Sequence, residues 1–301
     1  MRLGVVLLPQ ERWARDRERW QRVEEWGFDH AWTYDHLAWR SLADEPWLAT
    51  VPQLAAAAAT TSRIRLGTWV ASPNFRHPVP FAKDVMGLDD VSQGRLILGI
   101  GAGGGGFDAE VLGDAPTPRE RSDRFAEFLG LLDALLTQPV TDHEGPWYTA
   151  RGARMIPGCV QRPRVPFVVA ANGPRALAQA VRHGQGWATT GPDVAGEDPG
   201  AASEAWWAGV AALVGRFEAA CEAAGRDPGT VDRYLNLDSG PVFSLASEGT
   251  AVAAVRRAAD LGFTDVVLHW PRAEGIYAGR LEVLEAVAGR LPELRSLQPR
   301  R

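Results

Sequence analysis

The sequence predicts an α/β protein, a (β/α)8 TIM barrel with rim insertions, in which residues 1–301 form a single domain. Short apolar runs of strand length alternate along the chain with segments of helical periodicity, and eight such pairs can be counted. A length of 301 residues without an evident linker suits one barrel of about 250 residues with insertions. These observations favour a closed barrel over a doubly wound sheet.

The predicted strands are runs rich in apolar, β-branched or aromatic residues. The first, at residues 3–8, is continuously apolar up to Pro9, which is typical of a strand buried on both faces. The second is expected in the aromatic run HAWTYD, and the third in IRLGTWV. The eight strands are expected near residues 3–8, 30–35, 64–70, 95–100, 166–172, 186–190, 234–243 and 265–270.

The predicted helices carry apolar residues at intervals of three and four. In the first helix Trp20, Val23 and Trp26 share one face, and Gly27 ends it. The segment 140–158 breaks the alternation, and we interpret it as an irregular excursion or a hairpin on the rim. The helices are expected near residues 15–26, 47–61, 79–91, 118–137, 175–183, 203–224, 250–261 and 280–291.

Composition excludes several functional classes. A net charge of −5 argues against a nucleic-acid partner, which usually requires a basic surface. The two cysteines, Cys159 and Cys221, lack metal-ligand spacing and suit a reducing cytoplasm, and no metal site is expected. The apolar start is too short to span a membrane. Neither an H-x-H pair nor a G-x-S-x-G motif occurs, so amidohydrolase and triad chemistry are unsupported.

Candidate site residues should come from the carboxyl ends of the strands, because sites of such barrels lie there. The second strand ends in Asp35 and His36, and Trp39 follows. Histidine exchanges a proton near neutral pH and a neighbouring carboxylate can fix its tautomer, so we expect a catalytic pair. Trp39 could form a wall for a planar substrate. The alternatives are a surface cap for the pair and ordinary rim packing for Trp39.

The third and fourth strands end in residues that could support a flat ligand. Thr68, Trp69 and Val70 end the third strand, although such residues usually belong to a core. The run GAGGGG at 101–106, which includes Ala102 and Gly103, matches G-x-G-x-x-G after the fourth strand. A dinucleotide loop should open a long helix, whereas the following FDAEVLG is short. We therefore favour glycines that let the backbone approach a ring.

The fifth, sixth and eighth strands supply the remaining candidates. Proline in the first turn of the helix after the fifth strand leaves free N–H groups and a helix dipole that could bind a phosphate. Hydroxyl and backbone donors follow the sixth strand. For the residues after the fifth and sixth strands, the alternatives are helix capping and turn formation. The residues at the end of the eighth strand could line the substrate site or form a cluster on the rim. The candidates are Asn172, Gly173, Pro174, Thr190 and Gly191 for the phosphate, and His269 and Trp270 for the substrate.

Four segments, TYDHL, SRIRLGTWVASPNFRHP, LDDVSQGRLILGIGAG and VPFVVAANGPRALAQAVRHGQGW, resemble the bacterial luciferase-like monooxygenase superfamily, over residues from 3 to about 291. The Asp-His pair and SPNFRHP are most similar to the branch that uses the deazaflavin coenzyme F420. This resemblance implies an oxidoreductase that transfers hydride between F420 and a small, apolar or planar organic substrate. The alternatives are an FMN-dependent monooxygenase that uses O2 and flavin reduced by a separate reductase, and a non-catalytic flavin-binding barrel. A homodimer is also implied.

The resemblance assigns roles to the candidates by matching position. His36 would lie beside the reactive face of the ring, with Asp35 supporting it. A non-prolyl cis peptide at Trp69–Val70 would lie against the ring. The backbone of Ala102 and Gly103 would contact the ring's edge, and Gly173, Pro174, Thr190 and Gly191 would hold the phosphate. Gly105 stands where some sugar phosphate dehydrogenases of this branch carry a glutamate, which weakens the transfer of their specific substrate to this chain. A larger late insertion of the family is also missing, which implies a more open pocket.

Overall fold

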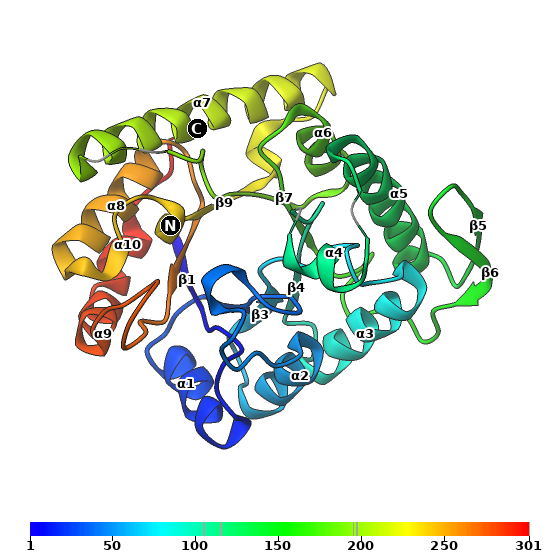
Figure 1. Ribbon diagram of the computed structural model, residues 1–301, viewed down its shortest axis with the longest axis horizontal. Helices are drawn as coiled ribbons and strands as arrows, with labels where there is room; N and C mark the ends of the chain where they lie inside the picture. The colour runs from blue at the N-terminus through cyan, green and yellow to red at the C-terminus, as the bar shows by residue number, and fades with distance from the viewer. Residues whose placement is uncertain (105, 115, 195, 197, 301) are drawn as a thin grey trace. The chain divides into compact units, whose positions relative to one another are not determined.

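Eight parallel strands form a closed barrel in the order β1-β10-β9-β8-β7-β4-β3-β2. Figure 1 labels the helices and several of the strands. The computed structural model describes residues 1–104, 106–114, 116–194, 196 and 198–300. The predicted (β/α)8 barrel is confirmed, and strands and helices alternate along the chain as expected. The barrel strands are β1 (Arg2–Val6), β2 (His30–Thr33), β3 (Arg65–Thr68), β4 (Leu96–Gly101), β7 (Phe167–Ala170), β8 (Gly186–Thr189), β9 (Asp232–Asn236) and β10 (Asp265–His269).

Helices follow the strands at the predicted positions. Several begin with the local signals that their sequences carry; α5, for example, starts after Thr117, which forms a capping box with Glu120. In the described part of the chain, no helix is both long and apolar enough to cross a membrane. The α-helices are α1 (Trp13–Glu25), α2 (Thr50–Thr60), α3 (Pro78–Val91), α4 (Phe107–Val111), α5 (Pro118–Thr137), α6 (Pro174–His183), α7 (Pro199–Ala223), α8 (Glu248–Asp260), α9 (Leu281–Gly289) and α10 (Leu291–Ser296).

The contacts within the chain divide it into two compact units. Unit 1 comprises Met1–Leu7, Arg22–Trp32 and Ala171–Arg301, and unit 2 comprises Leu8–Gln21 and Thr33–Ala170. Each unit contains barrel strands together with helices that follow them. The organisation of residues 1–301 as a single domain stays a prediction.

Unit 2 contains a two-stranded antiparallel hairpin formed by β5 (Val140–Glu144) and β6 (Thr149–Arg154). This hairpin is the rim insertion expected at 140–158. The Glu127 carboxylate on α5 accepts hydrogen bonds from the backbone N–H groups of Trp147 and Tyr148, at 3.2 and 2.9 Å. The Tyr148 ring packs edge-on against Phe128, with the ring centroids 5.6 Å apart. The hairpin is therefore anchored to α5 by both polar and aromatic contacts.

Unit 1 contains a buried polar cluster around Asp265, the first residue of β10. The carboxylate accepts two hydrogen bonds from the Arg2 guanidinium, both 2.7 Å, and lies 3.1 Å from His30 Nε2. Trp32 Nε1 donates to His30 Nδ1, so the ring's remaining proton lies on Nε2 and points to Asp265. Burial by itself would raise the pKa of Asp265, but the His30 and Arg2 hydrogen bonds and charges outweigh it and lower the pKa below its ordinary value.

The expected strand at 234–243 differs from the observed one. β9 ends at Asn236, because the Asn236 side chain accepts a hydrogen bond from the Asp238 N–H and starts a 3-10 turn at Leu237–Ser239. Such side-chain to backbone bonds compete with the strand ladder. The apolar residues beyond the turn therefore lie in a loop, although their composition is typical of a strand.

Candidate functional site

Asp35 and His36 follow β2 in unit 2, and their side chains have different partners. The Asp35 carboxylate accepts hydrogen bonds from Arg76 Nε at 2.9 Å and Arg76 Nη2 at 2.6 Å. Asp35 is almost fully buried, and the Arg76 guanidinium also lies over the Phe81 ring, 4.5 Å from its centroid. A buried carboxylate is tolerated when it is paired in this bidentate way. Asp35 therefore fastens the segment after β3 to the end of β2.

The carboxylate that holds the His36 ring is Asp108 on α4, whereas Asp35 was expected to support it. Asp108 Oδ2 lies 2.7 Å from His36 Nδ1, and Oδ1 accepts the Leu37 N–H at 2.7 Å. Asp108 is 5% exposed, and Trp47 Nε1 donates to the His36 carbonyl oxygen at 2.8 Å. The ring is thus held on one nitrogen while a quarter of the side chain stays exposed.

This arrangement fixes which nitrogen of His36 is available for chemistry. A carboxylate can only accept, so the neutral ring carries its proton on Nδ1 and leaves a lone pair on Nε2. No described residue forms a hydrogen bond with Nε2. The pair can therefore take a proton at Nε2, and the carboxylate stabilises the imidazolium that results.

Sequence reasoning missed Asp108. It follows the glycine run within FDAEVLG, a stretch too short to show helical periodicity and 72 positions from His36. Only the folded chain brings the two residues together.

Trp39, predicted as a substrate wall, is half-buried at the start of a 3-10 turn. Its ring meets Tyr34 edge-on at 5.0 Å, and the Arg40 guanidinium lies 4.8 Å from the ring centroid. One part of the indole thus packs in unit 2 and another part is exposed. Its role as a substrate wall stays a prediction.

The end of β3 lies closely against β4. Thr68 Oγ1 donates to the Gly99 carbonyl oxygen at 2.6 Å, and Trp69, 6% exposed, donates its N–H to the Thr33 carbonyl oxygen at 2.8 Å. The Trp69–Val70 peptide bond is cis, as the resemblance implies. A Cβ at Gly99 would overlap the Thr68 carbonyl oxygen, so only glycine permits this approach.

The glycine run after β4 is supported from the segment after β3. The Asn74 amide donates to the Gly104 carbonyl oxygen at 3.2 Å and accepts from Arg124 Nη2 at 2.8 Å. Gly103 has a φ of 73°, and a Cβ there would lie 2.5 Å from Asn74 Nδ2. Ala102 is half-buried, whereas Gly105 lies outside the described residues. Sequence reasoning did not single out Asn74 or Arg124, which brace the run.

In unit 1 the structure brings together candidates from the fifth and sixth predicted strands. Asn172 Nδ2 donates to the Gly191 carbonyl oxygen at 3.0 Å, and Thr189 Oγ1 donates to Asn172 Oδ1 at 2.7 Å. The Gly191 N–H donates to Thr189 Oγ1 at 3.0 Å. Thr190 between them is exposed. These bonds form a closed turn that joins the loops after β7 and β8.

Gly173 and Pro174 begin α6 beside this turn. Both are exposed, and among the described residues no side chain caps the helix at Gly173. Uncapped N–H groups in the first turn are the feature that makes a helix start able to bind an anion.

His269 and Trp270, predicted to line the substrate, have packing contacts within unit 1. His269 is completely buried; Asp238 Oδ2 lies 2.9 Å from its Nδ1 and accepts its backbone N–H at 2.6 Å. Tyr277 stacks on the imidazole with a centroid distance of 3.8 Å. Trp270 stacks on Trp26 at 5.8 Å. Both residues have packing partners within unit 1, and a role in substrate binding stays a prediction.

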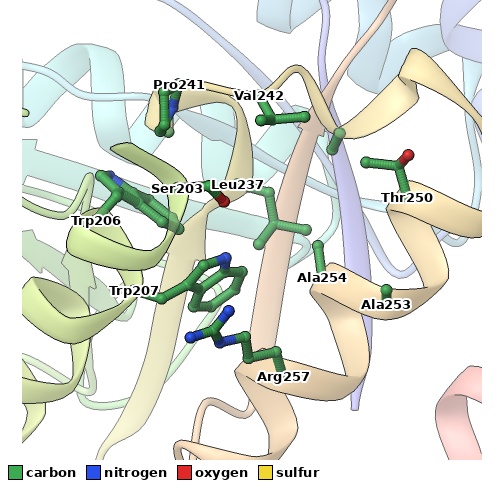
Figure 2. A pocket seen from close by; sticks show the side chains of 12 residues that line it. Ser203, Trp206, Trp207, Leu237, Pro241, Val242, Thr250, Ala253, Ala254 and Arg257 are labelled. Carbon is green, nitrogen blue, oxygen red and sulfur yellow. The ribbon is translucent and has the colours of Figure 1, made fainter. Parts of the chain in front are cut away.

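Unit 1 also has a cavity of about 230 Å³ between α7 and α8. Figure 2 shows Trp206 and Trp207 from α7 on one side and Thr250 and Arg257 from α8 on the other. Arg257 lies over the Trp207 ring at 5.0 Å and pairs with Glu204. None of the predicted site residues is among the described residues that line it, which are Ser203, Trp206, Trp207, Leu237, Gly240, Pro241, Val242, Ser244, Thr250, Ala253, Ala254 and Arg257.

The sequence matches a family model over nearly its whole length. Residues 1–280 match the model of the luciferase-like monooxygenases. The chain belongs to this family. The luciferase-like family membership implied by the four sequence segments is therefore confirmed.

Relatives of this luciferase-like protein include enzymes named for F420. It is 30% identical over 266 residues to the F420-dependent hydroxymycolic acid dehydrogenase of Mycobacterium tuberculosis (strain ATCC 25618 / H37Rv), covering 86% of this chain and 66% of that protein. It is 37% identical over 172 residues to the F420-dependent glucose-6-phosphate dehydrogenase of Beutenbergia cavernae, covering 56% of this chain and 50% of that protein. The luciferase-like chain thus spans about half to two thirds of these relatives.

A solved structure resembles the fold of nearly the whole luciferase-like chain. The coenzyme F420 dependent tetrahydromethanopterin reductase from Methanopyrus kandleri aligns with a TM-score of 0.74 over 97% of this chain and 99% of that chain. At 18% sequence identity, this likeness concerns the fold.

Proposed function

We propose that the chain is an oxidoreductase that transfers hydride between coenzyme F420 and a small organic substrate. The observation that carries the proposal is the His36–Asp108 pair, in which Asp108 holds Nδ1 at 2.7 Å and the ring stays partly exposed. This is the geometry of a general base or acid, which hydride transfer to or from an alcohol requires. The relatives named for F420 support the choice of cofactor.

The backbone beside the candidate residues leaves open space at one glycine in each unit. A Cβ built at Gly104 or Gly173 would meet no atom within 4 Å, so both positions face open space. We propose that the β3 end and the glycine run in unit 2 hold a ring. We propose separately that the α6 start and the Gly191 turn in unit 1 bind a phosphate. The proposed residues are Thr68, Trp69, Val70, Ala102 and Gly103 for the ring, and Asn172, Gly173, Pro174, Thr190 and Gly191 for the phosphate.

The bound deazaflavin would supply the hydride acceptor or donor. During oxidation of an alcohol, His36 Nε2 takes the hydroxyl proton as the hydride leaves the carbinol carbon. Asp108 keeps the ring oriented and stabilises the imidazolium. In the reverse direction the imidazolium returns the proton to the carbonyl oxygen. Asp35 contributes indirectly, because its bonds to Arg76 fix the backbone from which His36 projects.

Three further expectations belong to this proposal. The expectation of a homodimer is based on the family resemblance. The expectation of a cytoplasmic location is based on the two buried cysteine thiols. A reductase partner is needed only if the cofactor is FMN and the reaction uses O2.

A cofactor titration tests the proposal. We expect F420 to quench its fluorescence on binding the purified protein, with FMN binding at least about tenfold more weakly. Preferred binding of FMN would replace the proposal by the FMN-dependent alternative, and binding of neither would refute it. We also expect His36→Ala to lower turnover while cofactor affinity stays within a few fold. Unchanged turnover would remove His36 from the chemistry.

A further inference from the structure

The short helix α4 buries Asp108 together with Ala109 and exposes apolar residues beside Glu110. Its Asp108 is 5% exposed, whereas Phe107 and Val111 are 41% and 54% exposed, and Leu112 directly after the helix is 56% exposed. Surface helices usually turn apolar residues inward and charged residues outward. Phe107 and Val111 are four positions apart and share one face. Part of the outward side of this helix is therefore apolar and can meet a ligand.

Leu37 extends this apolar surface toward His36. Its side chain is 39% exposed, and its backbone N–H donates to Asp108 Oδ1 at 2.7 Å. The same carboxylate holds His36 Nδ1, so one side chain joins α4 to both residues. We call Leu37, Phe107, Val111 and Leu112 the apolar patch. It begins one residue from the proposed base.

The size and charge of the apolar patch distinguish between possible occupants. A stable dimer usually buries about 800 Å² and about 20 to 30 residues on each side, far more than four side chains supply. The exposed Glu110 lies within the same helix and disfavours an anionic membrane surface. A hydrocarbon group of a substrate bound at His36 fits both the extent of the apolar patch and its position.

We infer that the apolar patch binds the apolar part of the substrate. The substrate is accordingly an alcohol or carbonyl compound that carries a long hydrocarbon group, which extends from His36 over α4. This inference rests on the proposed function for the reacting end of the molecule. The hydrocarbon group adds affinity and specificity without taking part in the chemistry.

A pair of probes and a matched control test the inference. The double variant Val111→Ser/Leu112→Ser removes apolar surface at exposed positions, where serine is tolerated. Val140→Ser is the control, because Val140 is 42% exposed on the β5–β6 hairpin of the same unit. For the wild type we expect kcat/KM with F420 to be about 10- to 100-fold higher for 2-octanol than for 2-propanol. In the double variant the ratio of kcat/KM for 2-octanol to that for 2-propanol should fall below about threefold, whereas the control variant should have the same ratio as the wild type.

Binding of 2-octanone and acetone, measured by ligand-observed NMR without turnover, separates this inference from the proposed function. Tighter binding of 2-octanone by the wild type and control, but not by the double variant, supports the inference even if F420 does not bind. Equal chain-length dependence in the double variant and the wild type overturns it, as does the lack of any such dependence in the wild type. The proposed function fails separately if F420 does not bind and neither alcohol is oxidised.

Discussion

Substitution of Asp108 by asparagine should reverse the tautomer of His36. The carboxylate accepts two hydrogen bonds of 2.7 Å, one involving His36 Nδ1 and one from the Leu37 N–H. An amide has a single oxygen and can accept only one of them in this geometry. If that oxygen keeps the fixed Leu37 N–H, the NH2 group faces Nδ1 and donates to it. The ring then carries its proton on Nε2 and no longer has a lone pair there.

The expected loss of activity follows from this exchange. General acid–base catalysis contributes typically about 10²- to 10⁴-fold, so Asp108→Asn should lower kcat/KM for alcohol oxidation by about that factor. Cofactor affinity should change by less than about threefold, since the two side chains are isosteric. The exchanged ring tautomer is a second readout, which a purely structural role for Asp108 would not change.

The assay combines steady-state kinetics with ¹⁵N NMR of the histidine ring, which reports the protonated nitrogen. Asp142→Asn is the matched control, because Asp142 also accepts a backbone N–H, that of Gly152, but lies on the hairpin. A tautomer that changes as expected while kcat/KM stays within threefold of the wild type would refute the role assigned to the pair. An unchanged tautomer would refute the hydrogen-bond argument itself.

Three other predictions concern stability and reactivity. The pKa of Asp265 is lowered in the folded protein. The ionised carboxylate therefore stabilises the folded state above its ordinary pKa of about 4, and this stabilisation is lost as the pH falls through the pKa of the folded state. When the free energy of unfolding is measured with denaturant at several pH values, Asp265→Asn should reduce its decrease at acid pH. A decrease as steep as that of the wild type would contradict this. The added methyl group of Gly99→Ala overlaps the Thr68 carbonyl oxygen at the end of β3, so this variant should lower the free energy of unfolding by about 1–3 kcal/mol. In Gly87→Ala, on α3, the methyl group meets no described atom within 4 Å, so this variant should raise the free energy of unfolding by about 0.5–1 kcal/mol. Thermal unfolding of both variants tests these values. Burial raises the pKa of both the Cys159 and Cys221 thiols, so Ellman's reagent should label them only after denaturant is added, and rapid labelling of the native protein would contradict their burial.

The barrel could be predicted because its signal is local. Apolar runs such as 3–8 and helical spacing such as that around Trp20 report burial on each element, and burial is what the fold needs. The strand at 234–243 was wrong beyond Asn236, because a single side-chain hydrogen bond to the backbone ended the ladder early. Composition does not reveal that competition between a side chain and the strand.

The partners of the site residues were harder to predict, since they depend on tertiary contacts. Asp35 and His36 are neighbours in sequence, which suggested that they act together. In the structure Asp35 binds Arg76 and His36 binds Asp108, at separations of 41 and 72 positions. Sequence reasoning could place both residues at a strand end, but it could not choose among the many charged residues that loops bring to the same region.

Asp35 and Asp108 have different structural roles, and this determines how activity and specificity are linked. Asp35 fastens the segment after β3 to the end of β2, whereas Asp108 belongs to α4, which exposes Phe107 and Val111. A change that displaces α4 should therefore reduce proton transfer and the preference for long hydrocarbon groups together. A change of Val111 alone should reduce only the preference, because Asp108 and its two bonds remain. The proposed chemistry and specificity are thus separable by residue although one turn of helix carries both.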